Sequence, residues 1–573
     1  MNSYLVQHFL ENSAGRLPDK VALICGDARL TYGEIDERAS RVAWFLKERG
    51  IQRQDRVAIL LDNSVESVVS LFGILKADAI FIMLSPTMKA TKLSYILNDC
   101  QVKALITHRN KLDVVSTASA SVPSLNLVVF AGDKSKMANV TCPNPVFWDE
   151  VESLSSPHAS RLAPYSSESR ESQVASREGV GLANSSNASD SMNSEHVTCN
   201  SQPATRNPKL VTRNSVSSFN IDLDLATIIY TSGSTGKPKG VMLTHLNMVS
   251  AATSIISYLG NREEDVIMNT LPLSFDYGLY QVLMAFKFGG TVVLERSFTY
   301  PYQVIQKMIQ EKVTGFPGVP TVFALLLGLK DLDRFDVSNL RYITNTAAAL
   351  PTAHIERLRK VFPHVCIYSM YGLTECKRVS YLPPEEIDRR PASVGRGMPN
   401  EEVWIVDEQG NRVGPSIVGE LVVRGSNVMR GYWGLPEETD RVLRRGRDSE
   451  GVLLYTGDLF RMDEDGYLYF LGRKDDMIKS RGERISPKEI EQCLCGLNGV
   501  AEAAVIGVPD EILGQAIKAI ISVRDGYSLK EQDILKHCKE NLEDFMVPKF
   551  VQFAASLPKS GNGKIDKLSL KSL

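Results

Sequence analysis

The sequence lacks the features that would assign it to a membrane, secreted or nucleic-acid-binding class. It contains no run of about 18 apolar residues, so no transmembrane helix is expected. Its start, MNSYLVQHFLENSAGRLPDK, has neither a basic segment nor a long apolar one, so we expect no signal peptide and a cytoplasmic protein. Lys and Arg number 65 against 67 Asp and Glu. This near-neutral balance predicts no global attraction to nucleic acid or anionic lipid.

Cysteine is scarce and scattered. The nine cysteines are an odd number and show no spacing typical of a metal site. Only Cys493 and Cys495 lie close together, within a segment that has helical periodicity. We therefore expect free thiols in a reducing compartment rather than disulfides or a zinc site.

Hydrophobic patterning at the N-terminal end alternates between strand and helix. Residues 29–48 have apolar positions at helical spacing after a short strand-like start, and 55–61 and 103–107 are short apolar runs. Between these runs, ESVVSLFGILKADAIFIML is typical of a helix followed by a buried strand. Alternation of this kind predicts an α/β fold with a parallel sheet.

Two changes of composition divide the 573-residue chain. Residues 151–220 are rich in Ser with few large apolar side chains, which predicts a low-complexity surface insertion. Charged residues then interrupt a hydrophobic pattern near 472–476, and about 100 residues with their own helix and strand patterns follow. We predict a large α/β domain of parallel and mixed sheets over 1–473 and a small α+β domain over 474–573.

The segment YTSGSTGKPKG at 230–240 concentrates glycines, hydroxyl groups and two lysines. A strand-like run precedes it and a helical pattern follows, so we expect a loop that joins a strand to a helix. Glycine lets backbone N–H groups approach oxygen atoms, and hydroxyl and ammonium groups add donors, a combination typical of phosphate binding. The loop is not a Walker A motif, because Pro238 follows Lys237 where a magnesium-binding hydroxyl is required.

This loop resembles the signature of the AMP-forming adenylating enzymes, a superfamily of acyl-CoA synthetases, amino-acid adenylation domains and luciferases. Four further segments match the superfamily in its own order: YGLTE at 371–375, YTGD at 455–458, KSRGERISPKEIE at 479–491 and PKSGNGKIDK at 558–567. The resemblance covers nearly the whole chain except 151–220. It implies a large N-terminal domain and a small C-terminal domain that is mobile.

The resemblance also implies roles for individual residues. Thr374 would contact the α-phosphate of ATP, Glu375 would hold Mg²⁺, and Lys564 would be the catalytic lysine. Asp458 would accept hydrogen bonds from the ribose with support from Arg473, and Asp475 would be the hinge. The remaining expected nucleotide-binding residues are Thr231, Ser232, Gly233, Ser234, Thr235, Gly236, Lys239, Tyr371, Gly372 and Arg484.

The implied reaction has two steps. A carboxylic acid first reacts with ATP to give acyl-AMP and pyrophosphate, and a phosphopantetheine thiol then takes the acyl group. Catalysis of the first step is mostly charge neutralisation and alignment, because the carboxylate and the α-phosphate are both negative. The thiol belongs to CoA or to a carrier protein.

The segment LPLSFDYGLYQ at 271–281 lies where the family's acyl pocket begins, and it carries Asp276. A buried carboxylate needs a cation, and the α-ammonium of an amino-acid substrate would supply one, as in the amino-acid adenylation domains that this segment resembles. Arg378 is the alternative cation, and it could instead bind a second carboxylate of the substrate. A permanent pair between Asp276 and Arg378 would favour an acid without an amino group.

The segment NTAAAL at 345–350 stands where the family often has Ser-Gly-Gly. Its methyl groups predict a small pocket, and therefore a compact substrate such as proline rather than a long acyl chain. The expected pocket residues are Asp276, Tyr277, Tyr280, Thr346, Ala347, Ala348 and Arg378.

We therefore expect ATP-dependent activation of a small amino acid and its transfer to a separate carrier protein, without nucleic acid or membrane insertion. The alternative is an AMP-forming acyl-CoA ligase that uses CoA and a non-amino acid. A luciferase-like oxidative activity also stays open. A non-catalytic scaffold is the alternative of another class, and the presence of Thr374, Glu375, Asp458 and Lys564 argues against it.

Overall fold

The computed structural model describes residues 3–133, 141–154, 218–232, 238–346, 350–446, 451–474, 477–480, 483–510, 514–542, 546–559 and 564–571. The side chains of residues 232, 479, 483, 484, 514, 568 and 571 lie outside this description. Among the described residues, no helix is long and apolar enough to cross a membrane.

An eight-stranded sheet holds the predicted α/β units at the N-terminal end. Its order is β19-β9-β8-β4-β3-β5-β6-β7, and the strands from β8 to β7 are parallel, as the alternation predicted. The strands β9 and β19 are antiparallel to their neighbours. The bounds are β3 Arg56–Leu60, β4 Ile80–Met83, β5 Ala104–His108, β6 Leu127–Ala131, β7 Pro145–Phe147, β8 Leu225–Ser232, β9 Pro238–Thr244 and β19 Gly431–Tyr432.

A nine-stranded sheet has the order β16-β15-β14-β13-β12-β10-β11-β1-β2. Its centre is parallel, whereas the strands at both edges are antiparallel. The bounds are β1 Val21–Cys25, β2 Ala28–Thr31, β10 Val266–Asn269, β11 Thr291–Leu294, β12 Gly315–Gly318, β13 Tyr342–Asn345, β14 Cys366–Tyr371, β15 Ser380–Tyr381 and β16 Arg396–Gly397.

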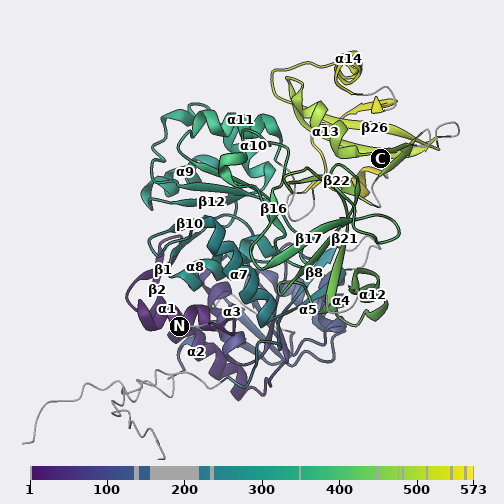
Figure 1. Ribbon diagram of the computed structural model, residues 1–573. Coiled ribbons are helices and arrows are strands. Elements are labelled where there is room, and N and C mark those ends of the chain that lie inside the picture. The colour runs from purple at the N-terminus through teal and green to yellow at the C-terminus, as the bar shows by residue number, and fades with distance from the viewer. Residues whose placement is uncertain are drawn as a thin grey trace, which may run out of the picture. The chain divides into compact units, whose positions relative to one another are not determined.

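Helices cover both sheets and share apolar cores with them. The largest core joins strands of both sheets to α1 His8–Arg16, α2 Tyr32–Glu48, α3 Val65–Lys76, α7 His245–Leu259 and α8 Asp276–Phe288. In Figure 1, α9 Pro301–Gln310, α10 Pro320–Leu327 and α11 Thr352–Val361 gather beside β12, and these helices form a second core with the nine-stranded sheet. The other helices before β8 are α4 Ala90–Asp99, α5 Leu112–Ser119 and α6 Trp148–Glu152.

Local sequence explains why α2 forms where it was predicted. The Thr31 hydroxyl accepts a hydrogen bond from the Glu34 N–H, and the Glu34 carboxylate accepts one from the Thr31 N–H, so two N–H groups at the start of the helix are satisfied. Ile35, Ala39 and Val42 recur at helical spacing and are buried. Burial of this face against α3 fixes the helix on the sheet.

Two smaller sheets follow along the chain. The first contains β17 Glu401–Val406, β18 Gly419–Gly425, β20 Leu443–Arg445, β21 Val452–Met462 and β22 Leu468–Arg473, and α12 Pro436–Val442 precedes β20. The second contains β23 Ile478–Ser480, β24 Glu483–Ile485, β25 Val500–Asp510, β26 Gly514–Val523 and β27 Phe550–Phe553. It packs with α13 Pro487–Gly496, α14 Glu531–Asn541 and α15 Lys567–Lys571 around its own cores. The predicted large and small domains are thus present as a mixed α/β architecture, and their exact boundary at 473 stays a prediction.

The predicted insertion over 151–220 falls mostly outside the described residues. Its first residues belong to the end of α6. Its last residues are ordered by side-chain contacts, since the Arg53 guanidinium donates to Asn220 and the Ser218 hydroxyl donates to Asp78.

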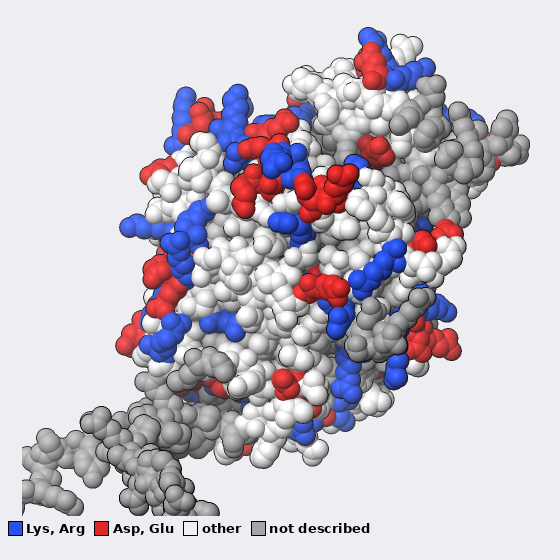
Figure 2. All heavy atoms as spheres, in the orientation of Figure 1, with Lys and Arg blue, Asp and Glu red and all other residues white. Residues whose placement is uncertain are grey.

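Charged side chains of both signs are interspersed over the face of the molecule that Figure 2 shows. This distribution agrees with the near-neutral balance of the sequence. Cys493 and Cys495 are free thiols, and the described residues contain no group of three or more His, Cys, Asp and Glu that could hold a metal ion.

Candidate active site

The segment at 230–240 joins two strands, so the prediction that it joins a strand to a helix was wrong. The strands β8 and β9 are antiparallel neighbours in which Thr231 pairs with Lys239 and Ser232 with Pro238. The reason lies in the residues after Pro238, where Val241 and Leu243 alternate into the core at the period of a strand. The helix α7 begins only at His245, after a cap by Thr244.

The C-terminal side of this hairpin is linked to the predicted metal carboxylate. The Lys239 ammonium lies 2.7 Å from the Glu438 carboxylate and 5.4 Å from the centre of the Tyr432 ring. The Tyr432 hydroxyl donates to Glu375 Oε1 at 2.8 Å. Burial and the neighbouring Glu375 charge raise the pKa of Tyr432, so its hydroxyl keeps the proton that it donates. These contacts hold Glu375 in a fixed orientation.

The motif YGLTE lies in a tight turn between β14 and β15. Lys377 has a positive φ of 70°, an uncommon conformation for a residue with a side chain. Its carbonyl oxygen approaches Gly372 so closely that a Cβ at that position would lie 2.2 Å away. Gly372 is therefore needed to close this turn, and the turn directs Thr374, Lys377 and Arg378 towards one pocket.

The predicted ribose carboxylate, Asp458, is buried and held from two sides. The Tyr371 hydroxyl donates to Asp458 Oδ2 at 2.6 Å, and Arg473 Nε donates to Oδ1 at 2.8 Å. The second contact follows from strand register, because Asp458 and Arg473 are partners across β21 and β22. The Asp458 charge raises the pKa of Arg473, and burial raises that of Tyr371, so both stay protonated donors. The structure thus brings together three residues that the sequence assigned to the nucleotide.

A small pocket of about 60 Å³ collects most of the predicted acyl-site residues. For comparison, a cavity of about 150 Å³ admits one benzene molecule. The first turn of α8 forms one wall, because residues three and four positions apart share a helix face. The lining residues are Ile255, Phe275, Asp276, Tyr277, Tyr280, Thr346, Gly372, Leu373, Thr374, Lys377, Arg378 and Lys564.

Asp276 pairs with Lys377 rather than with Arg378, which corrects the prediction of its protein partner. Lys377 Nζ lies 3.5 Å from Asp276 Oδ2, and the two side chains are 3% and 12% exposed. The ammonium also lies 5.1 Å from the centre of the Tyr280 ring. Burial lowers the pKa of Lys377, and the Asp276 charge opposes this shift. Lys377 is the residue that the sequence analysis missed, although Lys377 and Arg378 form an adjacent pair of cations directly after the YGLTE motif.

The tyrosines of α8 shape the apolar part of the pocket. The Tyr277 hydroxyl donates to the Thr344 carbonyl oxygen at 2.9 Å and lies 2.6 Å from the Thr344 hydroxyl. Burial raises the pKa of Tyr277 to about 12 and that of Tyr280 well above its usual value. The Tyr280 hydroxyl is buried and has no hydrogen-bond partner among the described groups. Both rings therefore act as neutral walls that limit the size of a substrate.

Lys564 enters the pocket from the C-terminal part of the chain. The residue is largely exposed, and it is one of the residues that line the pocket. Burial lowers its pKa, whereas Asp276, Asp458 and Glu375 favour the charged form. The Lys564 ammonium therefore interacts electrostatically with three carboxylates of the site, those of Asp276, Asp458 and Glu375.

Several predicted site residues cannot be placed. Arg484 belongs to β24, opposite Lys479, but its side chain is not described. The same holds for the side chain of Ser232 in β8. The residues that lie outside the description altogether are Gly233, Ser234, Thr235, Gly236, Ala347, Ala348 and Asp475.

The Glu375 carboxylate and its surroundings fit a magnesium ion that is shared with a nucleotide. Only the Tyr432 hydroxyl hydrogen-bonds to this carboxylate among the described side chains, so the carboxylate keeps oxygen lone pairs for a ligand. Mg²⁺ is usually bound by one or two carboxylates together with substrate phosphates and water. A single well-oriented carboxylate is therefore sufficient for such a site.

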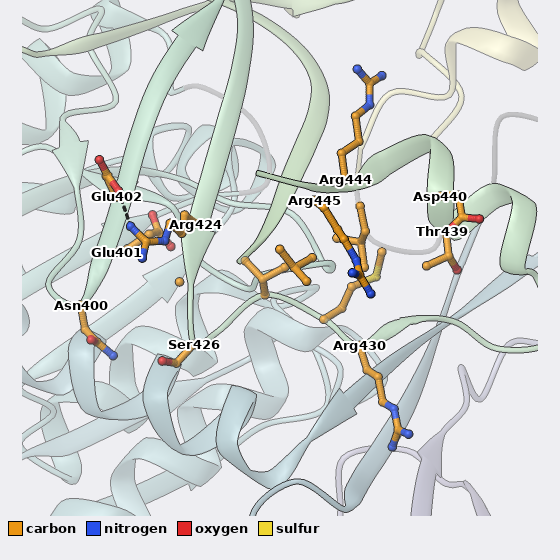
Figure 3. A pocket seen from close by; sticks show the side chains of 15 residues that line it. Asn400, Glu401, Glu402, Arg424, Ser426, Arg430, Thr439, Asp440, Arg444 and Arg445 are labelled. Carbon is orange, nitrogen blue, oxygen red and sulfur yellow. Dashed lines mark hydrogen bonds and ion pairs between the residues drawn. The ribbon is translucent and has the colours of Figure 1, made fainter. Parts of the chain in front are cut away.

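A larger hollow of about 830 Å³ lies elsewhere and contains none of the predicted site residues. Figure 3 shows Arg424, Arg430, Arg444 and Arg445 around it, with Arg424 paired to Glu402 at 3.1 Å. Its size alone does not make it the active site. The smaller pocket holds the converging lysines, the arginine and the motif residues, and we assign the candidate active site there.

Comparison with known proteins identifies the family of the chain. The profile described as "AMP-binding enzyme" matches residues 10–433, and that described as "AMP-binding enzyme C-terminal domain" matches 489–564. The long-chain-fatty-acid–CoA ligase of Bacillus subtilis is 30% identical over 564 residues, which cover 98% of this chain and 93% of the relative.

Solved structures of CoA ligases and related enzymes are similar over nearly the whole chain. The anthranilate CoA ligase AuaEII in complex with anthranoyl-AMP is similar with a TM-score of 0.81 and 25% identity, over 100% of this chain and 98% of that structure. ATP-bound MatB from Rhodopseudomonas palustris is similar with a TM-score of 0.79 and 25% identity, over 99% and 98%.

Proposed function

Because the chain belongs to the AMP-binding enzyme family and is an AMP-forming acid–thiol ligase, we propose that it joins a compact carboxylic acid without an α-amino group to CoA. The observation that supports this choice is the ion pair between Lys377 and Asp276. A protein cation already neutralises the carboxylate that an amino-acid substrate would need for its ammonium group. The sequence alone favoured an amino acid and a carrier protein, whereas the ion pair and the CoA ligases among the relatives favour the stated alternative.

In the first step of the proposed reaction, an oxygen of the substrate carboxylate attacks the α-phosphorus of ATP. The bond from this phosphorus to pyrophosphate breaks, pyrophosphate leaves with the electron pair, and acyl-AMP remains. Lys564 would bind both the carboxylate and the α-phosphate, and the Thr374 hydroxyl would donate to a phosphoryl oxygen. A magnesium ion on Glu375 would neutralise phosphate charge when bound.

The nucleotide would be oriented by groups that are already in place. Asp458 would accept hydrogen bonds from the ribose hydroxyls, and Tyr371 and Arg473 keep its two oxygens directed. Such preorganisation favours the reactive geometry because little rearrangement is needed during the reaction.

In the second step, the CoA thiolate attacks the acyl carbonyl carbon and AMP leaves. Lys564 has to withdraw for the thiol to approach, and the resemblance assigns this motion to Asp475 and the loop around Arg484. Both assignments remain part of the proposal, since these side chains lie outside the described residues.

An amino acid is the second candidate substrate, because Asp276 still faces the pocket. Its side chain is 12% exposed, and the Lys377 ammonium makes no hydrogen bond with correct geometry among the described groups. A substrate ammonium could therefore share the carboxylate with Lys377. This candidate would restore the separate carrier protein as acceptor.

The two candidates are separated by substrate-dependent ATP–pyrophosphate exchange, followed by thioester formation. The panel contains the twenty amino acids and short, aromatic and fatty acids, and CoA is then added to the active acid. Exchange with a non-amino acid and an acyl-CoA product would support the proposal. Exchange with one amino acid only, without a CoA thioester, would refute it in favour of the second candidate.

A further inference from the structure

Arg378 is a buried cation in the acyl pocket for which the described structure offers no counter-ion. It is 4% exposed, and its Nε has no hydrogen-bond partner among the described groups. No carboxylate of the described residues lies within 4 Å of its guanidinium, although ion pairs at this distance are common elsewhere in the chain. Removing a guanidinium from water without an anion is costly, and such groups are normally paired.

Among the described residues, the carboxylates around the pocket are each engaged by another group. Asp276 is paired with Lys377, Glu375 accepts from Tyr432, and Asp458 accepts from Tyr371 and Arg473. Apart from Lys564, which we assign to the nucleotide side, the described lining of the pocket carries one carboxylate, Asp276, and two cations, Lys377 and Arg378. The pairing of Asp276 with Lys377 leaves the positive charge of Arg378 without a described counter-ion.

The position of Arg378 is fixed by its surroundings. Asn427 donates to its backbone carbonyl oxygen at 3.2 Å, and its own N–H donates to the Cys376 carbonyl oxygen at 2.9 Å. The guanidinium lies 5.1 Å from the centre of the Tyr277 ring, which is itself held by Thr344. Stacking on a fixed ring presents the planar guanidinium as a rigid set of donors.

We propose that Arg378 binds a second carboxylate of the substrate, so that the acid activated by this enzyme is a short dicarboxylic acid. The inference rests on the proposed function, because it concerns the acid in the same pocket. Lys564 and Arg378 both line this small cavity, so one carboxylate faces the nucleotide side while the other reaches Arg378. An arginine matches a carboxylate with two parallel N–H···O hydrogen bonds, which a neutral group cannot reproduce. The small size of the cavity, about 60 Å³, favours a short chain between the two carboxylates.

The test compares each diacid with a neutral analogue of nearly the same shape, in which an amide replaces the second carboxylate. The pairs are malonate with malonamate, succinate with succinamate, and glutarate with glutaramate. The measured quantity is kcat/KM for ATP–pyrophosphate exchange by the full-length protein. We expect the best diacid to exceed its amide by about 100-fold or more, because the amide leaves a buried cation unpaired.

Variants assign this preference to Arg378. Arg378→Met should reduce the ratio of diacid to amide towards one, and Arg378→Lys should restore part of it. Arg389→Met is the matched control, since Arg389 lies on the same segment with its side chain 69% exposed, and the ratio should not change. ATP binding by each variant verifies that the nucleotide site is folded.

The outcomes separate the two claims. A monoacid or amide that equals its diacid in the wild-type protein would overturn the diacid inference and leave the proposed function intact. A diacid preference that persists in Arg378→Met would overturn the role of Arg378. Exchange with no acid, or with an amino acid alone, would overturn the proposed function and the inference with it.

Discussion

The ion pair between Lys377 and Asp276 should stabilise the fold as a coupled unit. Its atoms are 3.5 Å apart and its side chains are 3% and 12% exposed. At this separation the attraction is about 5 kcal/mol for an effective dielectric constant of about 20. The N-terminus of α8 already stabilises Asp276 by about 0.3–1 kcal/mol, and solvent screens part of the remainder. We therefore expect Lys377→Met to lower the free energy of unfolding by about 3 kcal/mol.

A double-mutant cycle measures this coupling. Lys377→Met and Asp276→Asn are made singly and together, and the free energy of unfolding is determined in urea. The double variant should lose about 2–3 kcal/mol less than the sum of the single variants, because the second substitution removes the charge that the first left unpaired. The exposed pair Lys536 and Glu540 is the control and should show less than about 0.5 kcal/mol of coupling. Additive effects at Lys377 and Asp276 would refute the reasoning.

Four further predictions concern the reaction and the dependence of stability on pH. Lys564→Ala should lower acyl-AMP formation by about 10²–10³-fold, whereas thioester formation from supplied acyl-AMP largely survives. Asp475→Pro should retain pyrophosphate exchange and lose acyl-CoA release. Tyr432→Phe removes a hydrogen bond to the Glu375 carboxylate, so adenylation should weaken on the order of 10-fold and need more Mg²⁺. Burial lowers the pKa of His245 from 6.5 to about 4, so below pH 6.5 the unfolded chain takes up a proton before the folded one. The free energy of unfolding should therefore fall by about 3 kcal/mol as the pH decreases from 6.5 to 4. The His245→Gln variant should lack this contribution to the pH dependence.

Each of these predictions has a result that contradicts it. Equal loss of both half-reactions in Lys564→Ala would remove its specific role in adenylation. Normal overall turnover of Asp475→Pro would exclude it as the hinge. An unchanged magnesium dependence of exchange in Tyr432→Phe would show that this hydroxyl does not support a metal carboxylate. Urea unfolding at several pH values checks His245, and the same pH dependence in His245→Gln would contradict its buried neutral state.

Local sequence patterns were sufficient to predict several helices and strands and the family. The α/β alternation at the N-terminal end predicted α2, β3, α3, β4 and β5 because burial of one helix face or of a whole strand leaves a clear period in the sequence. The sequence also singled out Tyr371, Asp458 and Arg473, whose contact with the nucleotide stays a prediction, and strand register brings the last two together. The likeness to the AMP-binding enzyme family followed from five short motifs in one order.

The loop at 230–240 shows where local reasoning failed. Apolar residues after Pro238 were compatible with both a helix and a strand, and periodicity in so short a run does not separate the two. The segment forms the strand β9 because it pairs with β8 on one side and with β19 on the other. Such pairing is a tertiary interaction with residues up to Tyr432, which the local sequence does not contain.

The sequence by itself determined the family, the order of its motifs and the presence of acidic and basic side chains near the acyl pocket. Only the tertiary structure decided which of these charges neutralise each other. Asp276 at the start of α8 meets Lys377 because the turn after β14 places Lys377 at positive φ and directs its side chain inwards. The next residue, Arg378, then lies over the Tyr277 ring, and no carboxylate of the described residues pairs with it. Pairing of buried charges depends on distances of a few ångströms between distant segments, and composition and spacing do not fix such distances.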